Sequence, residues 1–521
     1  MTRLETPPRS TWHTRAAGVG IGLLSLAAFL GVAQLTSPLV GPAGTPAIAI
    51  GANAVDLSPH ALKAFAIAHF GVHDKQILLG GIFATLVLAA AVVGFLSVRR
   101  RWLGLGALGA LTVVAAIAAA VRPGGGALAA VPSILGGIAA GAVFLLLWRL
   151  REPAVGPADL MDGTAPLPAR RRFLVGSAGV GAGALLAGLG GRSLIDKFYN
   201  ANSSRADVKI PAAADAPVTP GGVQLTVNEL PPFVTANKDF YRVDTALAVP
   251  QVAADTWSLR IHGMVDNELH LSFADLMALP LVERDITLTC VSNPIGGPYV
   301  GNARWTGALL KPLLEKAGVH AGADQILSRS VDGWTCGTPT KAVVDGRDAM
   351  LAFGMNGEPL PLIHGFPVRM LVPGIYGYAS ATKWVTDIQL TSFAESKAYW
   401  VERGYKEQAP IKTMSRIDTP RGLAVLPAGK VPIAGVAWAQ RRGIAKVEVQ
   451  IDGGEWQSAQ LAKQDTVDTW IQWVYLWDAK KGPHTITVRA TDMDGYTQTA
   501  DRVPEFPDGA TGRQNLVVTV N

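Results

Sequence analysis

Cys290 is the residue of this sequence best placed for metal chemistry. It stands in the run ITLTCVSNPIGG, where an alternating β pattern ends in a turn containing Asn and Gly. Only one other cysteine, Cys336, occurs in the 521 residues. Zinc or iron–sulfur sites built from several cysteines are therefore excluded. A metal bound at Cys290 must bring most of its own ligands, and the structural alternatives are a buried inert thiol or a disulfide to Cys336.

Cationic and aromatic side chains occur in several short segments on either side of Cys290. They are Phe240 and Arg242 in FYRV, Trp305 in NARWTG, His364 and Arg369 in IHGFPVR, Lys383 in ATKW, and Tyr405 in ERGYK. Guanidinium, ammonium and imidazole groups are the donors that phosphates and oxyanions require. The structural alternatives are charges at strand ends and aromatic rings in a core. The GxxxxGK[ST], HExxH and GxSxG motifs are absent, so nucleotide, zincin and α/β-hydrolase chemistries lose their usual residues.

The elements that must position these side chains form an α+β domain over residues 223–415. TWSLRIHGMV, DITLTCV, AVVDG and FPVRMLV have strand patterns, and FADLMAL and GALLKPLLEKAGV have helix patterns. A domain of about 200 residues buries a substantial core. A linker rich in Ala, Pro, Ser and Asp precedes it over residues 199–222.

Residues 416–521 change to short strands and turns. IAKVEVQIDGGEW, TWIQWVYLW, HTITVRATDMDG and QNLVVTV alternate in the manner of strands. This pattern predicts a C-terminal β-sandwich.

Residues 1–198 are predicted to be a transmembrane module. Five apolar stretches, each near the roughly 20 residues that cross a bilayer as a helix, occur at 16–34, 76–98, 102–121, 128–148 and 173–191. None of the nine histidines lies within these stretches. Haem held by two histidines inside the bundle is therefore not expected, and no haem is predicted in this chain.

Basic residues orient these helices. With the N-terminus in the cytoplasm, eleven arginines, from Arg3 and Arg9 to Arg172, fall on that side, whereas only Lys63, Lys75 and Arg122 fall opposite. This bias places the C-terminal part outside the cytoplasm. Residues 1–172 hold 14 basic and 6 acidic residues, which leaves 32 basic and 34 acidic residues for the rest. The pI of 9.2 is thus a topology signal, and nucleic acid is not an expected partner.

The fifth stretch begins with Arg170, Arg171, Arg172, Phe173 and Leu174, followed by a weakly apolar, glycine-rich run. The order resembles a twin-arginine export signal placed inside the chain. An ordinary positive cluster before a helix is the alternative.

The ordered set of Cys290, Trp305, the run HGFPVR from His364 to Arg369, the run VPG, and Lys383 before Trp384 resembles the sulfite oxidase family of molybdopterin enzymes. The resemblance covers residues 230–521, and together with the five apolar stretches it indicates a membrane-anchored bacterial member. It implies a sulfite-oxidase-type molybdopterin domain followed by an immunoglobulin-like dimerisation-type domain. The expected location is therefore the bacterial cell membrane, with a catalytic domain outside the cytoplasm.

The resemblance also implies the site residues. Cys290 would be the protein ligand of molybdenum, which needs sulfur donors from a pterin dithiolene and one thiolate. Phe240, Arg242, His364, Arg369 and Lys383 would bind the molybdopterin. Tyr405, Arg242 and Trp305 would line the substrate pocket. Where animal members have C-A-G-N-R-R, this chain has Cys290-Val-Ser-Asn-Pro-Ile295, and Arg513 lacks the family's usual surroundings. The anion pocket thus loses positive charge.

The resulting expectation is two-electron oxygen-atom transfer at a molybdenum-oxo centre, with a small oxo-donor or oxo-acceptor as substrate. Sulfite oxidation and reduction of a sulfoxide of the methionine sulfoxide type remain alternatives. A non-catalytic binding or assembly protein that kept the fold is the alternative of another class. The electron partner is expected to be a cytochrome, a quinone-linked protein or another membrane protein, and a homodimer through the C-terminal domain is one expected assembly.

Overall fold

The computed structural model describes residues 11–41, 44–59, 62, 65, 74–122, 126–152 and 169–521. Arg3, Arg9 and Lys63, which enter the charge count, lie outside these residues. The chain divides into two compact units. The first contains residues up to Asn200 together with Thr245–Val249, and the second contains Ala201–Asp244 and Pro250–Asn521.

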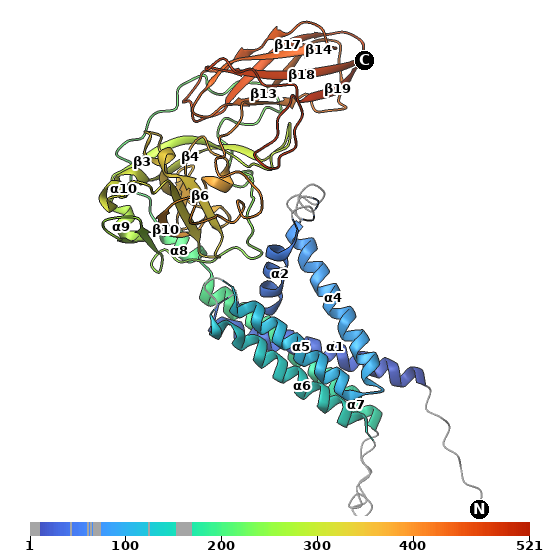
Figure 1. Ribbon diagram of the computed structural model, residues 1–521. Helices are drawn as coiled ribbons and strands as arrows, with labels where there is room; N and C mark the ends of the chain where they lie inside the picture. The colour runs from blue at the N-terminus through green and yellow to red at the C-terminus, as the bar shows by residue number, and fades with distance from the viewer. Residues whose placement is uncertain are drawn as a thin grey trace, which may run out of the picture. The chain divides into compact units, whose positions relative to one another are not determined.

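Long apolar helices make up most of the first unit (Figure 1). They are α1 (Thr11–Thr36), α4 (Asp74–Ser97), α5 (Arg101–Ala120), α6 (Val131–Arg151) and α7 (Ala169–Tyr199). Five helices of the described chain are long and apolar enough to cross a membrane, and they coincide with the five stretches predicted from hydropathy. The described part of this unit also contains α2 (Pro46–Leu57), η1 (Ser37–Leu39) and η4 (Ala127–Ala130). The apolar helix α2 was not predicted, because its 12 residues are too few to cross a bilayer.

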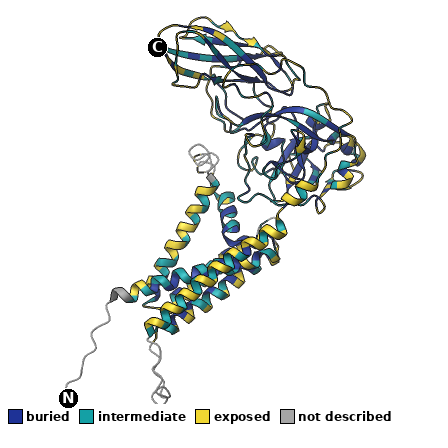
Figure 2. Cartoon of the chain, turned by 180° about the vertical axis from the view of Figure 1, so that it is seen from behind, coloured by how far each residue is buried: buried dark blue, intermediate teal, exposed yellow. Residues whose placement is uncertain are grey.

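Glycines allow these helices to approach closely. A Cβ atom at Gly18 of α1 would lie 2.5 Å from the carbonyl oxygen of Gly94 in α4. A Cβ atom at Gly31 would lie 2.5 Å from the carbonyl oxygen of Ala184 in α7. Small residues at such crossings are typical of helices that pack in lipid. The outward faces of the helices are exposed, as Figure 2 shows in yellow, and carry large apolar side chains such as Leu88 and Ile138.

Two sheets form the α+β part of the second unit. The first has the order β2-β1-β10-β5-β6, and only β1 and β10 run parallel. The second has the order β3-β4-β7-β8, is antiparallel, and carries β9 on β7. Their strands are β1 (Ser258–Gly263), β2 (Leu269–Ser272), β3 (Leu281–Thr289), β4 (Val300–Leu309), β5 (Gln325–Ser330), β6 (Thr335–Pro339), β7 (Met350–Met355), β8 (Glu358–Pro359), β9 (Arg369–Leu371) and β10 (Val385–Thr391).

Short helices precede or connect these strands. They are α8 (Asn202–Asp207), α9 (Phe273–Met277), α10 (Leu310–Ala317), α11 (Thr340–Val344), η6 (Leu362–His364) and η7 (Gly377–Ala379). In α10 the residues Leu310, Leu313, Leu314 and Ala317 are buried, which is the spacing of one helix face, and Gly318 ends the helix at φ 70°. The expected strand AVVDG at 342–346 is wrong, because Ala342, Val343 and Val344 belong to α11.

The C-terminal region contains two sheets that share one core. Their orders are β11-β13-β17-β16 and β12-β19-β18-β14-β15. The strands are β11 (Met414–Thr419), β12 (Val425–Leu426), β13 (Gly429–Trp438), β14 (Ile444–Ile451), β15 (Gln457–Ser458), β16 (Gln460–Leu461), β17 (Ile471–Ala479), β18 (Gly482–Asp492) and β19 (Asn515–Val520). Ile433 and Trp473 of one sheet pack with Val447, Val488 and Val518 of the other. This arrangement is a two-layer packing of sheets.

Residues 201–222, expected as a linker, run along the second sheet. The backbone N–H of Ala214 donates to the carbonyl oxygen of Leu281 at 3.0 Å, and the N–H of Glu283 donates to that of Asp215 at 2.8 Å. Ala201 is buried in a core that also contains Trp305. This segment therefore belongs to the second unit.

Candidate functional site

Cys290 follows β3 directly, as predicted, in a loop closed by backbone hydrogen bonds. Its N–H donates to the carbonyl oxygen of Tyr299 at 2.9 Å, and its carbonyl oxygen accepts from the N–H of Asn293 at 3.1 Å. The side chain of Asn293 accepts from the N–H of Tyr299 at 2.8 Å. Cys290 and Cys336 are both buried free thiols, so the disulfide interpretation is wrong. The loop holds one thiol in a fixed place.

Cys290, Ser292 and Tyr405 interact with one another. Burial raises the pKa of the Cys290 thiol, while hydrogen bonding by Ser292 and the charge of Lys383 lower it. Burial raises the pKa of Tyr405 to about 12, and the charge of Cys290 adds to this shift. Tyr405 therefore keeps its O–H proton near neutral pH and is a donor there.

Asp244 joins Arg242 and Lys383. Its Oδ2 accepts from Nε of Arg242 at 2.8 Å and from Nζ of Lys383 at 2.8 Å. Burial lowers the pKa of Lys383 to about 8, against the opposing effect of Asp244. Two cations share one carboxylate, which leaves a net positive charge for an anion.

His364 and Arg369 each bury a nitrogen that has no partner. The Nε2 of His364 lies 2.9 Å from the carbonyl oxygen of Asn237, and Nη1 of Arg369 donates to the carbonyl oxygen of His364 at 3.2 Å. Among the described residues, neither Nδ1 of His364 nor Nε of Arg369 has a hydrogen-bond partner. Burial lowers the pKa of His364 to about 4 and that of Arg369 to about 10. Because His364 is neutral and its Nε2 faces a carbonyl, its Nδ1 is an acceptor.

Trp305 does not line a pocket as expected. Its side chain is 0% exposed, and its indole N–H donates to the carbonyl oxygen of Ile286 at 3.1 Å. The guanidinium of Arg369 stacks on its ring at 4.9 Å, and the ring of Phe240 meets it edge-on at 5.7 Å. Phe240 also meets the ring of His364 edge-on at 5.6 Å. Trp305 and Phe240 thus support Arg369 and His364 from the core.

Three further residues of this region were missed from the sequence. Asp244 bridges two predicted cations, and Ser292 interacts with Cys290 and Tyr405. Tyr241 stacks on Phe240 at 5.2 Å, and its pKa is raised by burial and by the charge of Cys290. Their only sequence signal is position, since each lies within two residues of a predicted site residue.

Ile295 and Arg513 are the two positions at which the sequence predicted a loss of positive charge from the anion pocket. A Cβ atom at Gly512 would lie 2.8 Å from Cδ1 of Ile295, so this side chain packs against the segment before β19. Arg513 donates from Nε to the carbonyl oxygen of Gln498 at 3.1 Å and stacks on Trp456 at 5.2 Å. Its guanidinium is thereby held within the C-terminal region.

Comparisons with known proteins identify the family of this chain. The profile of the family described as "Oxidoreductase molybdopterin binding domain" matches residues 246–400. The sulfite oxidase of Gallus gallus is 30% identical over 309 residues, which cover 49% of this chain and 67% of that protein. The uncharacterized oxidoreductase YuiH of Bacillus subtilis is 35% identical over 149 residues, which cover 29% of this chain and 72% of that protein. The chain belongs to the sulfite oxidase family of molybdopterin-dependent oxidoreductases.

The chain spans only about half to two thirds of the length of several of its curated relatives. The mitochondrial sulfite oxidase of Homo sapiens is 29% identical over 320 residues, which cover 52% of this chain and 58% of that protein. Among solved structures, the sulfane dehydrogenase SoxCD of Paracoccus pantotrophus matches 55% of this chain and 83% of its own, with 24% identity and a TM-score of 0.49. The chain is a molybdenum-dependent oxidoreductase with molybdopterin as its cofactor.

The residues of the site fit that cofactor. A molybdopterin offers a phosphate, which suits the cations Arg242 and Lys383, and a pterin with donors and acceptors, which suits the unpartnered nitrogens of His364 and Arg369. Among the described residues, no group of three or more His, Cys, Asp or Glu side chains could hold a metal ion. One protein thiolate beside a ligand that brings its own sulfur is consistent with this.

Proposed function

We propose that this protein is a membrane-anchored molybdopterin oxidoreductase of the sulfite oxidase type, which transfers an oxygen atom to or from a small sulfur compound. One observation carries the proposal. A buried free thiol, two cations on a shared carboxylate, and two buried nitrogens without partners occur in one compact unit, and Cys290, His364, Arg369 and Lys383 lie within the residues 246–400 that the family profile matches. A purely structural core would leave few such nitrogens unsatisfied.

The proposed roles follow from the contacts. Cys290 is the protein ligand of molybdenum, and Arg242, His364, Arg369 and Lys383 bind the pterin and its phosphate. Phe240 holds the imidazole ring of His364, and Trp305 holds the guanidinium of Arg369. When bound, the cofactor supplies two-electron redox chemistry and oxygen-atom transfer.

The chain itself contributes placement and hydrogen bonding near Cys290. Tyr405 keeps its proton because burial raises its pKa to about 12, so its O–H is available to a polar oxygen of the substrate. Its ring is fixed by Tyr378, Trp400 and Phe506, at centroid distances of 5.2, 5.3 and 5.2 Å. Arg242 is 30% exposed and provides positive charge toward the substrate.

Sulfite is the first candidate substrate, because the relatives to which this chain is similar include the sulfite oxidases of Gallus gallus and Homo sapiens. A neutral sulfoxide, including one of the methionine sulfoxide type, is the second. The observation that favours it is Ile295, an aliphatic side chain packed near Gly512 where animal family members carry an arginine. Each charge-assisted hydrogen bond that is missing weakens oxyanion binding by about 1.5 to 3 kcal/mol.

The helical unit is proposed to span a bacterial cell membrane five times, with the N-terminus in the cytoplasm and the catalytic domain outside. The start of α1, the start of α5 and the end of α6 meet at one end of the bundle: Arg151 donates to the carbonyl oxygen of Thr14 at 3.3 Å, and Arg101 at the start of α5 pairs with Glu152 at 2.6 Å. Arg172 at the start of α7 donates to the carbonyl oxygen of Glu152 at 3.1 Å. One basic end of the bundle supports the positive-inside orientation.

The two-sheet C-terminal region is proposed to be an immunoglobulin-like domain that pairs two chains. Electrons are proposed to leave or arrive through an external carrier, either a cytochrome or a quinone-linked membrane protein.

The test is a substrate assay on the purified, cofactor-loaded chain with artificial electron carriers. Sulfite is offered with an electron acceptor, and methionine sulfoxide and dimethyl sulfoxide are offered with an electron donor. Turnover of either substrate class, in proportion to the molybdenum content of the sample, is expected. A preparation with one molybdenum per chain that turns over none of these compounds would overturn the proposed function.

A further inference from the structure

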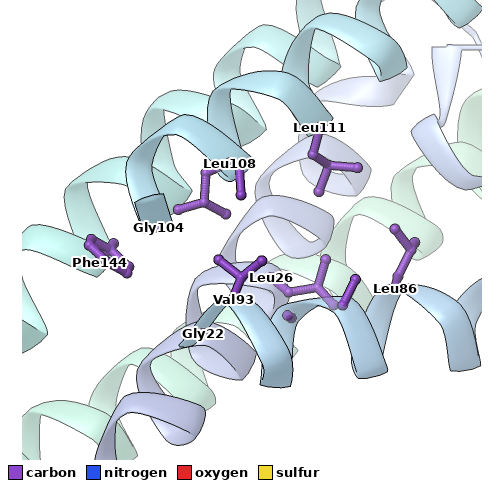
Figure 3. A pocket seen from close by; sticks show the side chains of 11 residues that line it. Gly22, Leu26, Leu86, Val93, Gly104, Leu108, Leu111 and Phe144 are labelled. Carbon is purple, nitrogen blue, oxygen red and sulfur yellow. The ribbon is translucent and has the colours of Figure 1, made fainter. Parts of the chain in front are cut away.

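An apolar cavity lies within the helical unit, between α1, α4, α5 and α6. It has a volume of about 110 Å³ and is lined by eleven residues, all of them Gly, Ala, Leu, Val or Phe. Figure 3 shows Leu26, Val93, Leu108 and Phe144 around it. It offers no side-chain donor or acceptor, so a quinone head group or a polar substrate would find no partner there. An apolar cavity near 150 Å³ accommodates a benzene-sized molecule, so this one accepts a stretch of hydrocarbon chain.

Toward its N-terminal end α4 leans away from the other long helices, as both overall views show (Figures 1 and 2), and the α4 residues that line the cavity lie in its second half. Gly22 of α1 and Ala90 of α4 lie at the close crossing, where a methyl group on Gly22 would collide with the Ala90 carbonyl oxygen. On the α5 side, Gly104 lies against the ring of Phe144, with a Cβ position 2.5 Å from Cε2. The space that remains between α4 and α5 is lined by Leu86, Val93, Leu108 and Leu111.

A basic cluster lies next to this cavity, at the same end of the helices. Phe144, which lines the cavity, meets Trp148 edge-on at 6.2 Å. The guanidinium groups of Arg101 and Arg151 lie over the Trp148 ring at 5.0 and 5.5 Å. The side chain of Arg101 is 51% exposed, and its ion pair with Glu152, itself 52% exposed, is of a kind that contributes little. The guanidinium is therefore accessible to another anion.

Trp148 adds a separate indication that a ligand binds here. Its side chain is only 5% exposed, yet its indole N–H has no hydrogen-bond partner among the described residues. A buried donor without a partner costs free energy unless something external satisfies it. An ester or phosphate oxygen would do so, and a pure hydrocarbon would not.

We propose that this end of the bundle binds one anionic phospholipid, with an acyl chain in the cavity and its phosphate beside Arg101, Arg151 and Trp148. The inference rests on the proposed insertion of the helices in a membrane. A basic pocket between membrane helices on the cytoplasmic side suits an anionic head group, and each nearby arginine strengthens binding by about five-fold. The ligand joins α4, α5 and α6 at the point where α4 diverges.

The experiment uses the full chain in nanodiscs of phosphatidylethanolamine that contain a minor fraction of isotope-labelled phosphatidylglycerol. Native mass spectrometry counts each lipid that stays on the protein after release. The wild-type chain retains labelled phosphatidylglycerol above its share of the bilayer. Arg101→Gln lowers this enrichment about five-fold, whereas the matched variant Arg149→Gln, at an exposed arginine of the same helix end, keeps it.

Cavity variants test the acyl chain independently. Ala107→Leu fills the cavity from α5 and Ala89→Leu fills it from α4, and each lowers the enrichment, whereas Ala110→Leu on the exposed side of α5 does not. Because these two variants fill the cavity from different helices, one of them still tests the acyl-chain site if the other fails to fold. Equal retention of the two lipids overturns the inference, as does equal loss with Arg101→Gln and Arg149→Gln. Retention of an isoprenoid that is insensitive to Arg101→Gln also overturns it. A chain that fails to integrate into nanodiscs instead contradicts the proposed membrane insertion.

Discussion

The ammonium nitrogen of Lys383 lies 2.8 Å from Oδ2 of Asp244, and the two side chains are 11% and 9% exposed. The same oxygen accepts from Nε of Arg242 at 2.8 Å. One carboxylate therefore compensates two cations in a largely desolvated place. The excess positive charge is tolerable if an anion completes the cluster, and the phosphate of the cofactor is such an anion.

Replacing Asp244 by Asn is expected to reveal this dependence. The substitution leaves the buried Lys383 and the partly exposed Arg242 without a countercharge, so the free energy of unfolding of the cofactor-free chain falls by about 3 to 5 kcal/mol. Bound cofactor offsets part of this loss. Denaturant unfolding of both forms measures the difference. Asp239→Asn is the control, because its pair with Lys238 is exposed at both side chains, 59% and 82%. Equal losses in the two forms would contradict the proposed phosphate contact.

Cofactor binding is expected to weaken as pH rises through about 8. Lys383 has its pKa lowered to about 8 by burial, so it is charged below that pH and neutral above it. An anionic phosphate prefers the charged form, and the affinity of the cofactor-free chain falls about ten-fold or more when the charge is lost. Titration with isolated molybdopterin between pH 6 and 10 measures this step. Lys383→Met removes it, whereas Lys412→Met, at a lysine bound to Asp508 and Gly509, retains it.

The two cysteines give a matched pair of variants. Cys290→Ser removes the soft thiolate, and activity is expected to fall on the order of a hundred-fold or more, because even residues outside the coordination sphere of a metal cost 10- to 100-fold. Cys336→Ser alters a thiol whose pKa burial raises to about 11 and which contacts Thr338 on β6, so activity persists. Molybdenum content and turnover are measured together. Molybdenum-dependent turnover in the Cys290 variant would show that another residue is the ligand.

Those parts of the structure that depend on local pattern were predictable. The five apolar runs located the five long helices, because bilayer length and hydropathy are properties of contiguous sequence. The helix ends were less exact, since α7 runs from Ala169 to Tyr199 whereas the apolar run spans 173–191. The loop of Cys290 after a strand also followed from the alternation of ITLTC and the turn residues behind it. Both are confirmed in the described residues.

Those parts that depend on tertiary contact were not predictable. An aspartate two residues after an arginine has no distinctive pattern, so the bridge from Asp244 to Lys383, 139 positions away, could not be inferred. Residues 342–344 were predicted as a strand because two adjacent valines are β-branched, yet three-dimensional packing buries Ala342 and Val343 in a helical turn. The burial of Trp305 likewise depends on Arg369 and Phe240, which come from other segments.

Trp305 distinguishes a supporting role from contact with the substrate. Trp305→Phe removes the hydrogen bond to Ile286 and reduces the stacking of Arg369, so the free energy of unfolding falls by about 2 to 4 kcal/mol. The KM for sulfite is expected to change little, since the indole is fully buried. Trp456→Phe is the control, because this ring also carries guanidinium groups, at 4.1 and 5.2 Å, but is only partly buried. A several-fold rise in the KM for sulfite at unchanged stability would show instead that Trp305 lines the substrate pocket.

The arginines before α7 separate a twin-arginine signal from an ordinary positive anchor. Arg170 and Arg171 are exposed at the start of that helix, so replacing both by Lys keeps the charge and the fold. A receptor that reads arginine would no longer export the folded, cofactor-loaded domain, whereas the positive-inside effect of lysine equals that of arginine. Protease accessibility of a reporter fused after Asn521 in spheroplasts measures export. The same double change at Arg99 and Arg100, also exposed, is the charge-matched control. Export that persists in both variants would favour the ordinary positive anchor, because lysine would then replace arginine at both pairs of positions without loss of export.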